Sequence, residues 1–169
     1  MIKHKEQRVG VFIDVANMYH SAKNLYSARV NYKEILTKAV AGRKLIRAIA
    51  YVVKAQIGEE ESFFSALDKQ GFEVKSKDLQ IFPGGMKKGD WDVGITIDMI
   101  KMSPQLDSIV LVTGDGDYLP AVQYLQFHGR QVEVMAFGKT TSAKLVEVAD
   151  DFIDLSTESR RYLITNRRY

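Results

Sequence analysis

Residues 9–14 read Val-Gly-Val-Phe-Ile-Asp, a β-rich apolar run that stops at a carboxylate, and this stretch decides the fold. A second run, residues 109–117, reads Ile-Val-Leu-Val-Thr-Gly-Asp-Gly-Asp. The continuous apolar residues of 109–113 predict a strand that is buried on both faces, as in a parallel sheet. Elsewhere, short β-rich runs alternate with amphipathic stretches, which is the pattern of βαβ units. The sequence therefore predicts a single-domain α/β fold with a mainly parallel central sheet.

The remaining elements follow from periodicity and from helix start and stop signals. The predicted strands are 8–14, 43–53, 72–74, 79–82, 109–113 and 131–137, with an edge strand at 152–155. The predicted helices are 17–26, one that starts near Asn31 as N-cap, 58–71, 90–102 with Asp90 as cap, 118–128 and 141–149. The glycine-rich segment 83–89 is predicted to be a loop.

Length and composition restrict the class of protein. The 169 residues are enough for one domain with a sizeable core. The chain has no cysteine, which excludes disulfides, thiolate metal sites and cysteine nucleophiles. The charged N-terminus lacks the apolar core of a signal peptide, and no stretch reaches the about 18 apolar residues that span a bilayer. We therefore expect a cytoplasmic protein with no membrane partner.

The charge of the chain gives little information about its binding partners. The net charge of +3 does not by itself indicate a nucleic acid. Four arginines crowd the end of the segment 157–169, which is predicted to be a basic C-terminal tail. Such a tail is either a solvated terminus or a contact to a phosphate backbone, and both interpretations stay open.

Four aspartates are predicted to meet at one edge of the sheet. Asp14 closes the first strand, Asp115 and Asp117 follow the strand 109–113, and Asp92 lies in the first turn of the helix 90–102. In a parallel α/β sheet, ligands bind outside the carboxyl ends of the strands. Carboxylates gathered there repel one another unless a hard cation lies among them, and oxygen-only ligands suit Mg²⁺ or Mn²⁺. This pattern points to metal-assisted phosphate chemistry.

Each motif also has a purely structural interpretation. Asp14 can cap the helix that follows it, with Asn17 as a turn residue, and Asp117 can cap the helix 118–128. In the functional interpretation, Asn17 presents its amide to the site and Thr113 hydrogen-bonds a carboxylate or a substrate phosphate.

Asp98 lies about 240° around the helix from Asp92, so its side chain cannot point in the same direction as that of Asp92. The three histidines are scattered along the chain, and the sequence contains neither the P-loop motif nor the glycine motif of dinucleotide-binding proteins.

In three ordered segments the chain resembles the NYN domain family, in its LabA-like branch, which is related to PIN-type nucleases. The segments are 11–17 (Val-Phe-Ile-Asp-Val-Ala-Asn), 92–99 (Asp-Val-Gly-Ile-Thr-Ile-Asp-Met) and 111–118 (Leu-Val-Thr-Gly-Asp-Gly-Asp-Tyr). Residues 149–155 resemble the closing stretch of the family, so the match covers about residues 8–156.

The resemblance implies a Rossmann-like, PIN-like three-layer fold and a metal-dependent ribonuclease. Asp14, Asp92, Asp115 and Asp117 would be the catalytic and metal-binding set, and Asn17 would support the substrate. Asp98 matches a commonly acidic family position without a defined role. Where the family often has Lys-Gly, this chain has Gly89-Asp90, with Lys87 and Lys88 shifted upstream.

Three functions are therefore considered. The leading one is an endoribonuclease that hydrolyses RNA through water activated by Mg²⁺ or Mn²⁺, with Lys87, Lys88, Lys139 and the terminal arginines guiding the RNA backbone. The second is a non-catalytic regulatory module that binds RNA or a protein through the same acidic face. The third is a small-molecule phosphatase or a phospho-acceptor domain, with Lys139 near a late strand. Exposed aromatic residues are compatible with a homodimer, which the sequence does not decide.

Overall fold

The computed structural model describes residues 1–54 and 60–165. Its strands are β1 (Arg8–Asp14), β2 (Arg29–Val30), β3 (Lys44–Val53), β4 (Glu73–Lys77), β5 (Gln80–Ile81), β6 (Lys87–Lys88), β7 (Ser108–Val112), β8 (Gln131–Ala136), β9 (Asp151–Asp154) and β10 (Leu163–Ile164). Its α-helices are α1 (Val15–Tyr26), α2 (Tyr32–Val40), α3 (Glu60–Lys69), α4 (Asp92–Met102), α5 (Leu119–Phe127), α6 (Ala143–Val148) and α7 (Ser159–Tyr162). Short 3₁₀ turns are η1 (Ser103–Gln105), η2 (Gly116–Tyr118), η3 (Gly138–Thr140) and η4 (Leu155–Glu158).

The central sheet has six parallel strands in the order β4-β3-β1-β7-β8-β9. Counted along the chain within this sheet, the order is 3-2-1-4-5-6, which is the order of a doubly wound Rossmann fold. The direction of winding reverses between β1 and β7. The carboxyl ends of these two strands therefore form a topological switch point, the place where open α/β sheets bind ligands.

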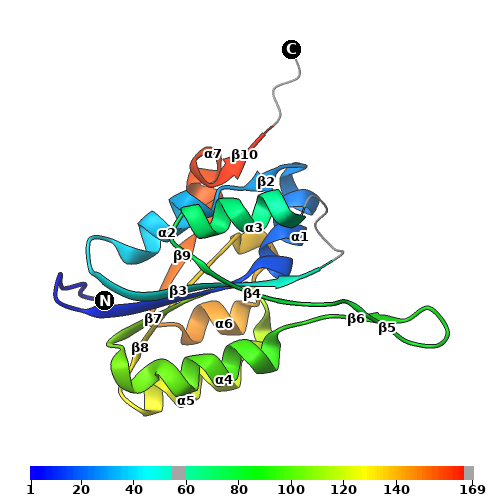
Figure 1. Cartoon of the computed structure of the whole chain (residues 1–169). Coiled ribbons are helices and arrows are strands. Elements are labelled where there is room, and N and C mark those ends of the chain that lie inside the picture. The colour runs from blue at the N-terminus through cyan, green and yellow to red at the C-terminus, as the bar shows by residue number, and fades with distance from the viewer. Residues whose placement is uncertain (55–59, 166–169) are drawn as a thin grey trace.

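Helices cover both faces of the sheet, so the fold has three layers. Figure 1 shows α1, α2 and α3 on one face and α4, α5 and α6 on the other. On the first side, Met18 of α1 and Ile35 of α2 are fully buried against the sheet. On the second side, Ile95 of α4 and Leu125 of α5 are fully buried. The predicted α/β, Rossmann-like three-layer fold is confirmed.

Several boundaries differ from the expected ones for local reasons. Helix α1 begins at Val15 instead of residue 17, because Asp14 itself acts as the N-cap. Asn31 caps α2 as predicted, by accepting from the Glu34 backbone N–H. Asp90, by contrast, is not the cap of α4: the N-cap is Trp91, which makes no side-chain capping bond. The predicted start of α3 at 58–59 lies outside the described residues.

The segment expected to be a loop, 83–89, contains one strand of a hairpin. Strands β5 and β6 pair antiparallel, and the chain turns at Gly84 and Gly85, both with positive φ. Figure 1 shows this hairpin as an arm that extends away from the sheet at the end where the parallel strands finish. Its apolar side chains Ile81 and Met86 are exposed.

The described part of the basic segment 157–169 is folded onto the domain. Strand β10 pairs antiparallel with β2, a small sheet that sequence patterning did not predict. Tyr162 is 1% exposed, and the Arg161 Nε donates to Glu34. Arg167 and Arg168 lie outside the described residues.

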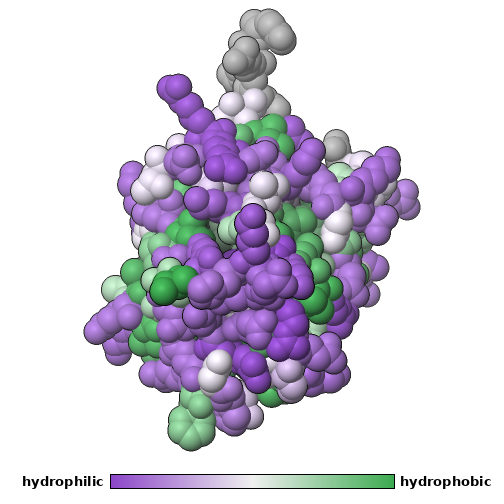
Figure 2. Space-filling model, turned by 90° about the vertical axis from the view of Figure 1, so that its left-hand side faces the viewer, coloured by the Kyte–Doolittle hydropathy of each residue, from purple (hydrophilic) through white to green (hydrophobic). Residues whose placement is uncertain are grey.

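The end of the molecule at which the parallel strands begin carries charged pairs. Figure 2 views this end and shows a mostly hydrophilic surface with separate apolar patches. Exposed ion pairs join Arg8 to Asp107 and Lys44 to Glu6. Over residues 1–54 and 60–165, no helix is long and apolar enough to cross a membrane.

Candidate metal centre

The site is built where β1 and β7 finish side by side. Their register pairs Ile13 with Val112, so the next residues, Asp14 and Thr113, lie together at the switch point. The Thr113 Oγ1 donates to Asp14 Oδ2 across 3.3 Å. Asp14 also accepts from the Asn17 backbone N–H at 3.3 Å, so it caps α1 and faces the site at the same time. The structural and functional interpretations of Asp14 are therefore compatible.

The turn after β7 is fixed by short-range hydrogen bonds. Asp115 Oδ1 accepts from the Asp117 N–H at 2.9 Å, and the Asp115 N–H donates to Thr113 Oγ1 at 3.3 Å. Asn17 Oδ1 accepts from the Gly114 N–H at 3.0 Å, which ties the start of α1 to this turn. A Cβ on Gly114 would lie 2.9 Å from Thr141 Oγ1, so only glycine fits this close approach.

Three of the four predicted aspartates form an acidic cluster. Asp92, Asp115 and Asp117 each place a carboxylate oxygen within 4.8 Å of the others. Asp92 comes from the first residue of α4, and the other two come from the turn after β7. Asp92 and Asp115 are partly exposed, and Asp117 is exposed, so solvent and ligands reach all three.

Tyr118 connects Asp14 to this acidic cluster, and sequence reasoning missed it. Its hydroxyl lies 3.3 Å from Asp14 Oδ2 and 3.2 Å from Asp92 Oδ1, so its single proton can be donated to either carboxylate. The ring is buried, with 1% of the residue exposed. A tyrosine after an Asp-x-Asp turn looks like a core residue in the sequence, and only the fold shows that its hydroxyl reaches the site.

The electrostatics of the site disfavour the ionised forms of Asp14 and Asp92. Burial raises the pKa of Asp14 to about 6, and repulsion from Asp92 adds to this effect. Burial also raises the pKa of Asp92, followed in size by repulsion from Asp115 and Asp90. Both shifts mean that the folded site resists full ionisation. A hard divalent cation would relieve that repulsion, and the donor set of carboxylate oxygens matches Mg²⁺ or Mn²⁺.

Asp98 lies outside the acidic cluster and has partners of its own. Its Oδ2 accepts from the Tyr51 hydroxyl at 2.8 Å and from Lys75 Nζ at 2.7 Å. Burial opposes ionisation here, but the bonds from Lys75 and Tyr51 outweigh it, so the pKa of Asp98 falls below its usual value. In this structure Asp98 is an ion-pair partner that joins α4 to β3 and β4.

The structure describes only some of the lysine side chains that were predicted to contact RNA. Lys87 and Lys88 form β6 through their backbone, and their side chains lie outside what the structure describes. Lys139 is exposed in η3, close along the chain to Thr140 and Thr141, which flank the Gly114 turn.

Comparisons with known proteins give matches both for the sequence and for the fold. The model of the NYN domain matches residues 8–156. The chain is 25% identical to the low amplitude and bright protein LabA of Synechococcus elongatus, over 90% of this chain and 86% of that protein. It is 27% identical to an uncharacterized protein of Methanocaldococcus jannaschii, and this match spans 90% of the chain and 57% of the archaeal protein. A crystal structure of a Vibrio parahaemolyticus protein of unknown function matches with a TM-score of 0.86 and 30% identity, over 97% of this chain and all of that one.

Proposed function

The chain belongs to the NYN domain family, and from this premise we propose that it is a metal-dependent endoribonuclease that hydrolyses RNA phosphodiester bonds. One observation carries the proposal. Asp92, Asp115 and Asp117 bring carboxylate oxygens within 4.8 Å of one another beside the switch point of a Rossmann-like sheet. Burial and repulsion from Asp115 raise the pKa of Asp92, and a divalent cation among the three carboxylates would offset that repulsion.

In this proposal Asp92, Asp115 and Asp117 hold Mg²⁺ or Mn²⁺, and Asp14 completes the set from the end of β1. A divalent ion bound there supplies positive charge to phosphodiester oxygens and lowers the pKa of water. Asp14 keeps its place through Thr113 and Tyr118, whose hydroxyls lie 3.3 Å from its Oδ2.

The remaining residues of the site act on its shape. Asn17 fixes the turn by accepting from the Gly114 N–H, and Thr113 joins Asp14 to the Asp115 backbone. Asn17 is partly exposed and is proposed to support the substrate, whereas Thr113 is fully buried and acts on the site through Asp14. Lys87 and Lys88, on the hairpin arm, are proposed to contact the RNA backbone, because lysines there add positive charge beside an acidic site.

The test compares metal binding and RNA cleavage in three proteins: wild type, Asp115→Asn and the control Asp68→Asn. Asp68 is an exposed aspartate of α3, outside the acidic cluster. At about 100 times its Kd, Mn²⁺ should raise the Tm of wild type and of Asp68→Asn by roughly 5–10 °C. Both should cleave a pool of single-stranded and structured RNA, and Asp115→Asn should lose the Tm shift and the cleavage together.

The same experiment separates the alternative function. If all three proteins bind the RNA pool and leave it intact with Mn²⁺ present, the chain is a regulatory module that binds RNA. If wild type neither cleaves RNA nor gains stability from Mn²⁺ or Mg²⁺, the ribonuclease proposal is wrong.

A further inference from the structure

A cavity of about 390 Å³ lies at the base of the hairpin arm. Its lining comes from the end of β4, from β5 and from the segment that leads into α4: Lys77, Asp78, Gln80, Phe82, Gly89 and Asp90. Binding sites for small molecules start at about 300 Å³, so a group the size of a nucleobase fits. Of the functional residues discussed above, none whose side chain the structure describes lines this cavity.

The cavity adjoins the acidic cluster. Asp90, which lines the cavity, lies two residues before Asp92 of the cluster. Trp91 stands between them, with its Nε1 donating to the Val52 carbonyl at 3.0 Å. The Lys77 ammonium lies 4.7 Å from the centre of the Trp91 ring. Three consecutive residues therefore connect the cavity to the cluster, so a polymer that passes the cluster also passes the cavity.

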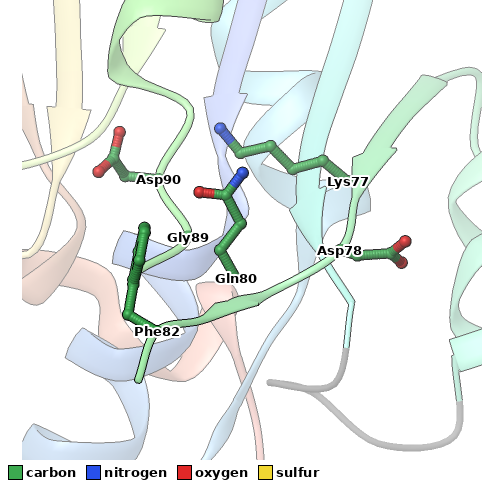
Figure 3. Close-up of a pocket in the computed structure, with 6 residues that line it drawn as sticks. All are labelled: Lys77, Asp78, Gln80, Phe82, Gly89 and Asp90. Carbon is green, nitrogen blue, oxygen red and sulfur yellow. The ribbon is translucent and has the colours of Figure 1, made fainter. Parts of the chain in front are cut away.

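The lining combines an aromatic ring with polar groups that have room for a ligand. Phe82 is 40% exposed, and in the described part of the chain its ring has no aromatic partner. Gln80 is exposed, and its side chain makes no hydrogen bond to a described residue. Figure 3 shows the polar ends of Lys77 and Gln80 directed into the same space, whereas Asp78 points away from it. A ring face beside hydrogen-bond donors suits a nucleobase.

We propose that this cavity binds one unpaired nucleobase of the RNA, next to the phosphate held at the acidic cluster. The base stacks on Phe82, and Lys77 and Gln80 donate to acceptors on its polar edge. The base is unpaired because a base inside a duplex does not offer its face to a side chain. A bare anion fits less well, since Asp90 lines the same cavity as Lys77. This inference rests on the proposed ribonuclease function.

The test uses Phe82→Ala, with Ile81→Ala as the matched control. Ile81 is the neighbouring residue on the arm, is 69% exposed and does not line the cavity. Stacking on an aromatic ring predicts that Phe82→Ala lowers kcat/KM for a ten-nucleotide RNA by roughly 5- to 100-fold. Ile81→Ala should leave kcat/KM unchanged, and both variants should keep the Mn²⁺-induced rise in Tm.

A set of RNAs with one abasic position each identifies the base. Loss of the base at one position near the cleaved bond should slow wild type by about the factor seen for Phe82→Ala, and it should slow Phe82→Ala no further. Equal cleavage by Phe82→Ala and Ile81→Ala, or a further loss in Phe82→Ala at every abasic position, would overturn the assignment.

Failure of the ribonuclease function has a different signature. In that case wild type cleaves no RNA and Mn²⁺ does not raise its Tm. Fluorescence anisotropy with the same intact RNAs then tests, independently of cleavage, whether the cavity binds a nucleobase. Weaker binding by Phe82→Ala than by Ile81→Ala supports a nucleobase site, and equal binding contradicts it.

Discussion

At the scale of single residues, Asp14 is under opposing demands. It ends a buried strand with 7% of its surface exposed, yet a metal site needs it ionised. Hydrogen bonds from Thr113 and the Asn17 N–H favour the carboxylate, but burial outweighs them and the pKa rises to about 6. Without a cation, the ionised side chain therefore destabilises the folded protein.

This conflict predicts the effect of Asp14→Asn on stability. Because the folded protein binds the Asp14 proton more tightly than the unfolded chain, wild type loses stability as pH rises from about 4 through 6. Asparagine keeps an oxygen that caps α1 and carries no charge. With EDTA at pH 8, the variant should be more stable than wild type by about 1–3 kcal/mol. Urea unfolding from pH 4 to pH 8 measures the difference.

Two controls are the pH dependence of the stability difference and its change when Mn²⁺ is added. The gain should shrink to about 0.5 kcal/mol near pH 4, where the folded Asp14 is protonated and the unfolded one is roughly half protonated. With saturating Mn²⁺ the order should reverse, since the variant offers the ion one carboxylate less. If the variant is less stable than wild type at pH 8 in EDTA, the folded protein does not disfavour the ionised form of Asp14, and this explanation is wrong.

At the scale of elements, β1 and β7 could be predicted from the sequence, because a strand that is buried on both faces consists of consecutive apolar residues. The two strands then bring Asp14 beside the Asp115 turn. The pairing of β2 with β10 was not predictable, because two-residue strands have no periodicity and their partners lie far apart in the chain. The same limit applies to Tyr118, whose hydroxyl reaches Asp92 only through the packing of α4 against η2.

The end of α2 carries strain that a substitution can remove. Ala41, its C-cap, has a φ of 50°, in the left-handed region that disfavours a Cβ. Glycine adopts this conformation freely, although it also gains entropy in the unfolded chain. We expect Ala41→Gly to stabilise the protein by about 0.5–1 kcal/mol in urea unfolding. Lys38→Gly, within the same helix, should instead destabilise it by about 0.5–1 kcal/mol.

At the scale of the whole molecule, the two ends of the sheet have different roles. The acidic cluster and the arm lie where the strands finish, and the carboxylates there repel one another. Toward the end where the strands begin, Glu133 of β8 is fully buried and pairs with Arg43 at 2.8 Å. Ser108 of β7 donates to the same carboxylate, and Lys3 lies 3.1 Å from it. Arg43 also donates to the Ala39 carbonyl of α2 at 2.8 Å, so the network joins α2, β7 and β8 and stabilises the fold at a distance from the site.

Removing one partner of the buried pair should therefore reduce stability without changing the site. Glu133→Gln leaves the Arg43 guanidinium buried with its charge uncompensated, and we expect a loss of about 3–5 kcal/mol in urea unfolding at pH 7. Arg43→Met combined with Glu133→Leu should recover most of that loss, because two apolar side chains leave no buried charge. In each variant that remains folded, the Mn²⁺-induced rise in Tm should match wild type. If Glu133→Gln abolished that rise while the protein stayed folded, the acidic cluster would depend on the far end of the sheet, and the separation of the two ends would be wrong.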